Sequence, residues 1–221
     1  MTPTPSVLKI VQVGHPVLRQ TARALTGHEV RAPETARLIE EMRETMRDAP
    51  GVGLAAPQVG HALQIVVVED RPEYVERLSV DERQARLRKP LPFQVLVNPR
   101  LTFLDRAPVA FFEGCLSFAD FMMVVPRAHA VRVDALDHQG HAFSLTAEGW
   151  PARILQHEID HLHGVLCVDR MTPRTLTSTR NHLQHWQHAP VQSVLATVGN
   201  TSETDALLPS AFGSPDAEPE G

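Results

Sequence analysis

The chain has 221 residues, of which 43% are hydrophobic and 21% charged, a composition typical of a globular protein with a substantial core. Its net charge of -5 arises beyond Arg180, where there are five acidic residues and no basic ones; the other 21 acids equal the 21 bases, which argues against a broad nucleic-acid-binding face. No apolar run approaches the roughly 20 residues of a membrane span. The segment Met1–Ser6 lacks the pattern of a secretory signal, so we expect a cytoplasmic protein.

Periodicity and punctuating residues predict the elements of the first half of the chain. The helix is the clearest, because Pro33 suits its first turn and Leu38, Ile39, Met42 and Met46 form an apolar stripe. The glycine-rich stretch predicts a loop whose backbone approaches something closely. In chain order the predictions are a strand at 9–14, a helix at 33–48, a glycine-rich loop at 51–60, a central strand at 64–69 and a charged surface excursion within 70–92.

The second half begins with a run of strands rather than an alternation of strands and helices. We therefore predict an α+β fold, with small mixed or antiparallel sheets packed around a central helix. The predicted elements are strands at 94–98, 110–113, 124–135 and 141–146, the helix 151–164, a short strand at 165–168 and a helix at 177–189. Residues 1–189 are expected to form a single catalytic domain, followed by a flexible acidic tail at 190–221 rich in Pro, Ser and Ala.

The central helix carries the motif His157-Glu158-Ile159-Asp160-His161. On a helix, His157 and His161 stand one turn apart and point the same way, so both imidazoles can bind one metal ion. Glu158 lies beside them, within reach of a water on that metal. Two buried histidines and a glutamate without partners would each cost roughly 1–3 kcal/mol, and a metal removes that cost. A chance match on a polar helix is the alternative interpretation.

A catalytic metal commonly has three protein ligands and one open position. Cys167 follows His161 by six residues, a spacing similar to that of the metzincin proteases, with cysteine in place of their third histidine. However, Cys167 sits in an apolar run, where cysteine behaves as a core residue. Cys115 follows Gly114, whose backbone freedom can turn the sulfur toward a site. We therefore prefer Cys115 as the third ligand.

Three motifs in order, at residues 51–58, 113–117 and 156–161, together with residues 14–19, resemble the peptide deformylase family over residues 8–171. The resemblance implies removal of the N-formyl group from formylmethionine at the start of nascent polypeptides, near the ribosome, without DNA or membrane partners. It implies one divalent metal per chain, most often Fe(II), replaceable by Zn(II), Ni(II) or Co(II). It assigns Cys115, His157 and His161 as ligands and Glu158 as general base and acid, and it assigns the Gln58 amide and Leu116 backbone N–H as the oxyanion hole.

The same resemblance implies substrate contacts from seven residues: Val52, Gly53, Leu54, Gly114, Met122, Trp150 and Ile154. Many bacterial members carry arginine where this chain has Met122, so preference beyond the first substrate residue is the feature expected to differ. We also expect Arg127 to pair with Glu113 and brace the cysteine loop. The alternative functions are a zinc endopeptidase that uses His157, His161 and Cys167, and a non-catalytic relative that binds formylated peptides; the oligomeric state is left open.

Overall fold

The computed structural model describes residues 6–198 and contains one six-stranded antiparallel sheet of order β1-β2-β3-β4-β5, with β6 paired to β4. The strands are β1 Gly53–Ala55, β2 Ile65–Asp70, β3 Leu91–Cys115, β4 Phe118–Leu136, β5 Ala142–Glu148 and β6 Thr177–Ser178. The α-helices are α1 Gly27–Val30, α2 Pro33–Asp48, α3 Pro72–Glu76, α4 Val80–Ala85, α5 Gly149–Leu162, α6 Cys167–Arg170, α7 Thr179–Asn181 and α8 Val191–Val198. Short helical turns lie at η1 Pro16–Arg19, η2 Ala56–Val59 and η3 His182–Trp186. The predicted α+β class is confirmed.

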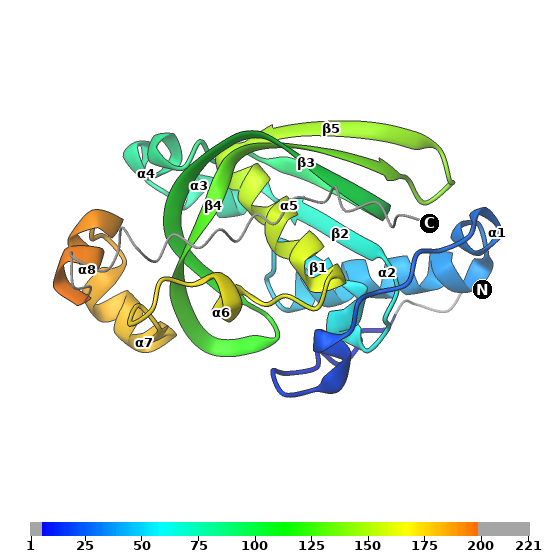
Figure 1. Ribbon diagram of the computed structural model, residues 1–221, viewed down its shortest axis with the longest axis horizontal. Coiled ribbons are helices and arrows are strands. Elements are labelled where there is room, and N and C mark those ends of the chain that lie inside the picture. The colour runs from blue at the N-terminus through cyan, green and yellow to red at the C-terminus, as the bar shows by residue number, and fades with distance from the viewer. Residues whose placement is uncertain (1–5, 199–221) are drawn as a thin grey trace, which may run out of the picture.

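The strands β3 and β4 form a long hairpin that curves around α5 (Figure 1). The sequence predicted two strands, 94–98 and 110–113, where the structure has the single strand β3. Its pairing with β4 shifts register at several points between Val97 and Pro108, and such irregularities bend a strand and increase its twist. The bend explains why the apolar pattern is interrupted in the middle of β3. It also brings Cys115, at the end of β3, toward the helix.

The central helix α5 is buried along nearly its whole length, since every residue from Pro151 to Leu162 is buried. The chain leaves it through Gly164 in a left-handed conformation with φ of 71°, and a Cβ there would lie 2.7 Å from the carbonyl oxygen of Arg19. The predicted helix from Pro151 to Gly164 is therefore confirmed apart from its ends. Each fully buried leucine or isoleucine of this helix contributes roughly 1.5–3 kcal/mol of apolar burial.

The two faces of strand β2 pack against different helices, α5 on one face and α2 on the other. Side chains alternate between the faces of a strand. Val66 and Val68 accordingly pack in the core cluster of α5, whereas Ile65 and Val67 pack with Met42 of α2 in a second cluster. The predicted boundaries of α2, Pro33 and Asp48, are confirmed. The predicted strand at 64–69 is also confirmed, and it lies inside the sheet between β1 and β3.

Two predicted strands are wrong. Residues 9–14 form no strand, and the backbone N–H groups of Val11 and Val13 donate to two separate acceptors, the carbonyl oxygens of Gln58 and Ser117. Residues 165–168 run into the short helix α6, because the carboxylate of Asp169 accepts a hydrogen bond of 2.7 Å from the Leu166 N–H and favours a helical turn. Apolar residues predicted extended chain at both places, but within residues 6–198 neither segment pairs with a strand.

The C-terminal part differs most from its prediction. The expected helix at 177–189 is divided into β6, α7 and η3. The tail was expected to begin at residue 190, but residues 191–198 form α8, with Val191 and Val194 buried against Phe112 and Val124. That part of the tail prediction is wrong, and its remainder, 199–221, lies outside the described residues. The excursion within 70–92 is present and contains α3 and α4. Among residues 6–198 no helix is both long and apolar enough to cross a membrane.

Candidate metal centre

Three metal-binding side chains converge where the end of β3 meets the middle of α5. The sulfur of Cys115 and one ring nitrogen each of His157 and His161 all lie within 4.8 Å of one another. Cys115 Sγ is 3.4 Å from His161 Nε2. The two imidazole rings, one helical turn apart, have centroids 5.1 Å apart and planes inclined at 73°. The structure thus brings together the three residues that the sequence analysis preferred as ligands.

The spacing and chemistry of these donors fit one transition-metal ion. Metal–sulfur bonds of about 2.3 Å and metal–nitrogen bonds of about 2.0–2.1 Å place the donors of a shared ion at comparable separations. A thiolate and two imidazoles favour zinc or iron over magnesium or calcium. Two nearby atoms, His161 Nδ1 and Glu158 Oε2, are buried without a hydrogen-bond partner among the described residues. Three ligands leave one coordination position open for a water molecule or substrate.

The two cysteines have different surroundings. Cys115 lines the site, and the Gln58 side-chain amide donates to its sulfur over 3.6 Å. Cys167 is buried among apolar neighbours that include Met123 and Val125, and it is not one of the three converging donors. The Cys115 thiol donates a hydrogen bond to the Cys167 sulfur, and this bond together with burial raises the pKa of Cys115. A coordinating thiol is nevertheless deprotonated by its metal ion. The geometry therefore does not favour the endopeptidase arrangement.

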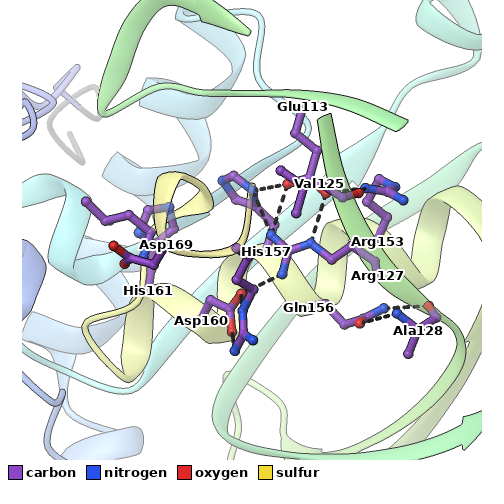
Figure 2. A network of polar contacts seen from close by, with 12 residues as sticks. Glu113, Val125, Arg127, Ala128, Arg153, Gln156, His157, Asp160, His161 and Asp169 are labelled. Carbon is purple, nitrogen blue, oxygen red and sulfur yellow. Dashed lines mark hydrogen bonds and ion pairs between the residues drawn. The ribbon is translucent and has the colours of Figure 1, made fainter. Parts of the chain in front are cut away.

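A buried polar network orients the first histidine (Figure 2). His157 Nδ1 lies 3.0 Å from a carboxylate oxygen of Glu113, which leaves its Nε2 to face the other two donors. Arg127 donates to both oxygens of Glu113 at 2.9 Å, which confirms the expected pair. Arg153 donates to the same carboxylate at 2.6 Å, and Arg127 also reaches Asp160. Because Glu113 lies on β3 beside Cys115, the network connects the cysteine strand to the histidine helix.

Electrostatics follow from this packing. Burial lowers the pKa of His157, but the Glu113 hydrogen bond and the charge of Glu158 outweigh it and raise that pKa to about 9. A bound cation takes the place of that proton. Burial raises the pKa of Glu113, but Arg127 and the His157 hydrogen bond more than offset it and hold that pKa well below its usual range. Burial raises the pKa of Glu158 to about 7, a value suited to proton transfer near neutral pH.

Glu158 is held against β1. A Cβ on Gly53 would lie 2.6 Å from Glu158 Cδ, so only glycine fits at that position. The side chain of Gln58 is fixed nearby, because its Oε1 accepts a hydrogen bond of 2.8 Å from the Ala55 N–H. The free end of this amide, Nε2, points toward Cys115. The sequence predicted that the glycine-rich stretch approaches another group closely. In the structure that group is the side chain of Glu158.

A cavity of about 810 Å³ opens over these groups. Gln58, Leu116 and six of the seven predicted substrate contacts line it: Val52, Gly53, Gly114, Met122, Trp150 and Ile154. The exception is the Leu54 side chain, which is fully buried in the core cluster of α2 because successive residues of β1 face opposite ways. Sequence reasoning missed Arg86 and His182, which also line the cavity, because neither belongs to a recognisable motif.

Comparisons with known proteins agree with this geometry. The family model for polypeptide deformylase matches residues 7–176. The chain is 46% identical over 172 residues to peptide deformylase 1A, chloroplastic, of Solanum lycopersicum. The matched residues make up 78% of this chain and 62% of that protein. It is 44% identical over 192 residues to peptide deformylase 3 of Streptomyces avermitilis, with coverage of 87% and 84%. Among solved structures, the Met-Ala-Ser-bound class I type b peptide deformylase of Acinetobacter baumannii is similar, with a TM-score of 0.67, 32% identity and coverage of 76% and 99%.

Proposed function

The chain belongs to the polypeptide deformylase family, and on that basis we propose that it removes the N-formyl group from N-terminal formylmethionine of new polypeptides, releasing formate. The observation that carries the proposal is the convergence of Cys115, His157 and His161 beside the buried acid Glu158. The solved relative with bound Met-Ala-Ser supports a peptide as the ligand of the cavity. Formylated N-termini emerging from the ribosome are the proposed substrates, and the cytoplasm the proposed location.

The deformylase family depends on a metal, and we propose Fe(II) for this chain, with Zn(II), Ni(II) or Co(II) as substitutes. Cys115, His157 and His161 would hold the ion. When bound, the ion lowers the pKa of a water molecule toward about 7 and so supplies a nucleophile at neutral pH. Glu113 keeps His157 in the orientation that this role requires.

The remaining steps belong to the side chains. Glu158 accepts the proton of the attacking water and delivers it to the amine that leaves, and its pKa of about 7 suits both transfers. Negative charge develops on the formyl oxygen, and we assign its stabilisation to Gln58 Nε2 and the Leu116 backbone N–H, both on the cavity wall. Loss of one such donor costs roughly 10²–10³ in rate in a well-studied hydrolase.

We propose that the substrate peptide lies extended between the loop of Val52 and the strand end at Gly114. The small size of Gly53 and Gly114 lets a peptide backbone approach, as it does when a strand is added to a sheet edge. Trp150 and Ile154 of α5 supply apolar surface to the bound peptide.

The test is an anaerobic assay of the purified full-length chain with two peptides. One is formyl-Met-Ala-Ser, and the other is an N-acetylated peptide with internal peptide bonds. We expect formate release from the first without cleavage of the second. Internal cleavage of the acetylated peptide at a comparable rate would support the endopeptidase alternative and overturn the proposal. Binding of the formyl peptide without any release of formate would support the non-catalytic alternative.

A further inference from the structure

Two segments remote in sequence meet at one end of the cavity. Arg86 follows α4 in the surface excursion, and His182 begins η3 near the C-terminus; both line the cavity that contains the metal-binding side chains. Glu82 of the excursion lies 3.8 Å from His188 of the C-terminal segment, so the two segments approach each other. Residues 177–198 lie beyond the region matched by the family model. This wall is therefore built partly from chain that the family model does not describe.

Arg86 is held in place at this wall. Its carbonyl oxygen accepts a hydrogen bond of 2.8 Å from the backbone N–H of Trp150, which fixes the excursion to the start of α5. Its guanidinium lies over two aromatic rings, 5.2 Å from the centroid of Trp150 and 5.6 Å from that of Phe111. The residue is half-buried. Such stacking orients the planar group while leaving its N–H donors available for a ligand.

The charge of Arg86 is not compensated by a carboxylate. The neighbouring arginines of the cavity are paired, Arg88 with Asp70 at 2.8 Å and Arg153 with Glu113 at 2.6 Å. Among residues 6–198, Arg86 has no carboxylate within 4.0 Å.

The acids near this end are engaged or lie elsewhere on the wall. Glu82 attracts Arg86, but the same carboxylate accepts hydrogen bonds of 2.9 Å from the backbone N–H and hydroxyl of Ser79. Asp120 also lines the cavity, on the segment that follows Cys115. Burial and the charge of Arg88 lower the pKa of Arg86, as expected for a cation that lacks a partner. The Arg86 end of the cavity therefore favours an anionic group.

The position of Arg86 relative to the metal site defines which part of a substrate it can meet. Trp150, on which Arg86 stacks, precedes His157 by seven residues of one helix, or about 10 Å at roughly 1.5 Å per residue. An extended peptide advances about 3.3 Å per residue. A peptide whose formyl group lies at the metal site thus brings its second to fourth residues to the distance of Arg86.

We propose that Arg86 is a specificity-determining residue that binds a carboxylate side chain, aspartate or glutamate, in the substrate beyond its first residue. This inference rests on the proposed deformylase function. The planar guanidinium can donate two parallel hydrogen bonds to such a carboxylate.

The test compares formyl-Met tetrapeptide amides that carry Asp or Glu at position two, three or four with the matching Asn or Gln peptides. At low salt we expect a KM about threefold to fivefold lower for the acidic peptide at one or more positions, with similar kcat, as for an ion pair at a partly exposed site. The ratio should shrink at high salt. Peptides with a free C-terminal carboxylate, assayed in parallel, separate a terminal from a side-chain contact.

Three variants separate binding from folding. In Arg86→Met, the KM for the acidic peptide should nearly equal the KM for the matching neutral peptide. In Arg86→Glu, the preference should reverse, so that lysine-containing peptides have the lower KM. Arg83→Met, which removes a charge from α4 away from this cavity, should retain the native ratio. A native ratio of one at every position, or a ratio that survives in Arg86→Met, would overturn the inference alone. Failure to deformylate even the neutral peptides would overturn the proposed function as well.

Discussion

Glu158 and Gly53 illustrate how far a single atom matters at this site. A Cβ on Gly53 would clash with the side chain of Glu158. We predict that Gly53→Ala lowers kcat for a formyl-Met peptide by about 10²-fold, because a misplacement of roughly 1 Å in a reacting group has an effect of that size. Metal content should stay unchanged, since the three atoms nearest to the new Cβ all belong to Glu158 and none to the converging donors. Gly27→Ala is the matched control, because its new Cβ would meet only Arg31, at 3.8 Å. Native kcat in Gly53→Ala would contradict the role given to Glu158.

Glu113 is the residue on which the buried network depends. It accepts hydrogen bonds from Arg127, Arg153 and His157. We predict that Glu113→Gln lowers the free energy of unfolding by about 3–5 kcal/mol, because two buried guanidinium groups lose their shared anion. Metal affinity should fall about 10–100-fold, because a neutral amide replaces the carboxylate that orients His157. Urea denaturation and metal titration measure the two effects.

The control for Glu113 is Asp134→Asn, which alters an exposed carboxylate that pairs with Arg132 and accepts from Ser144, and which should have a much smaller effect on stability than Glu113→Gln. If Glu113→Gln were no more destabilising than Asp134→Asn, the network would not have the structural role assigned to it.

At the scale of single residues, the sequence predicted that Cys115, His157 and His161 converge, because these residues belong to compact motifs with fixed spacing. Their roles as metal ligands stay predictions. It also predicted the pair between Arg127 and Glu113, which the structure confirms. It did not predict Arg86 or His182. Their participation depends on two surface segments meeting in space, and isolated polar residues carry no local signal of such a contact. Leu54 stays a predicted substrate contact, although its side chain is buried in the core cluster of α2.

At the scale of elements, a surface ion pair joins α2 to β2. Arg47 donates to both carboxylate oxygens of Glu69 at 2.8 Å. This hydrogen bonding lowers the pKa of Glu69 below 4.5, against the opposing effect of burial. A lowered pKa in the folded state contributes stability that is present above the unfolded value and is lost as pH falls through the folded value.

We therefore predict that Glu69→Gln lowers the free energy of unfolding by about 0.5–1 kcal/mol at pH 7, a value discounted for the partial exposure of Arg47. The difference from the native chain should shrink below pH 4.5 and disappear below the folded pKa. Denaturant titrations from pH 7 to pH 3 measure it. Glu76→Gln, an exposed acid at the end of α3 without an ion-pair partner among residues 6–198, should show no comparable loss. A difference that grew on acidification would contradict the sign.

Helices were predicted better than strands because their signals are local. Pro33 and a stripe at helical spacing define α2, and Pro151 and Gly164 bound α5. The strand β3 was predicted as two pieces, because its bulged middle lacks an apolar pattern, although pairing with β4 keeps it extended. Residues 9–14 have the reverse character, with apolar residues but no partner strand. Strand formation depends on neighbours that the local sequence does not reveal.

At the scale of the whole molecule, α8 closes the outer side of β3 and β4. Val194 is 1% exposed and packs in the cluster of Phe112 and Val124. Phe112 lines the cavity and stacks on His182, with ring centroids 4.4 Å apart. The C-terminal segment is thus joined both to the core and to the candidate site, although its composition suggested a tail.

We predict that Val194→Ala lowers the free energy of unfolding by about 1–3 kcal/mol, because it leaves a cavity between α8 and the sheet. Chemical denaturation monitored by circular dichroism provides the measurement. Gln192→Ala, on the exposed side of the same helix, should change stability by less than about 0.5 kcal/mol. Equal stability of the two variants would show that α8 does not pack on the sheet in solution.

We infer that strand β3 and helix α5 bring one sulfur and two imidazoles to a single ion. The most direct test is the metal content of anaerobically purified full-length protein, compared among the native chain, Cys115→Ala and Cys167→Ala. We predict about one metal ion per native chain, near-complete loss in Cys115→Ala, and retention in Cys167→Ala, whose sulfur is not among the converging donors. Retention of the ion in Cys115→Ala together with its loss in Cys167→Ala would show that Cys115 is not the sulfur ligand.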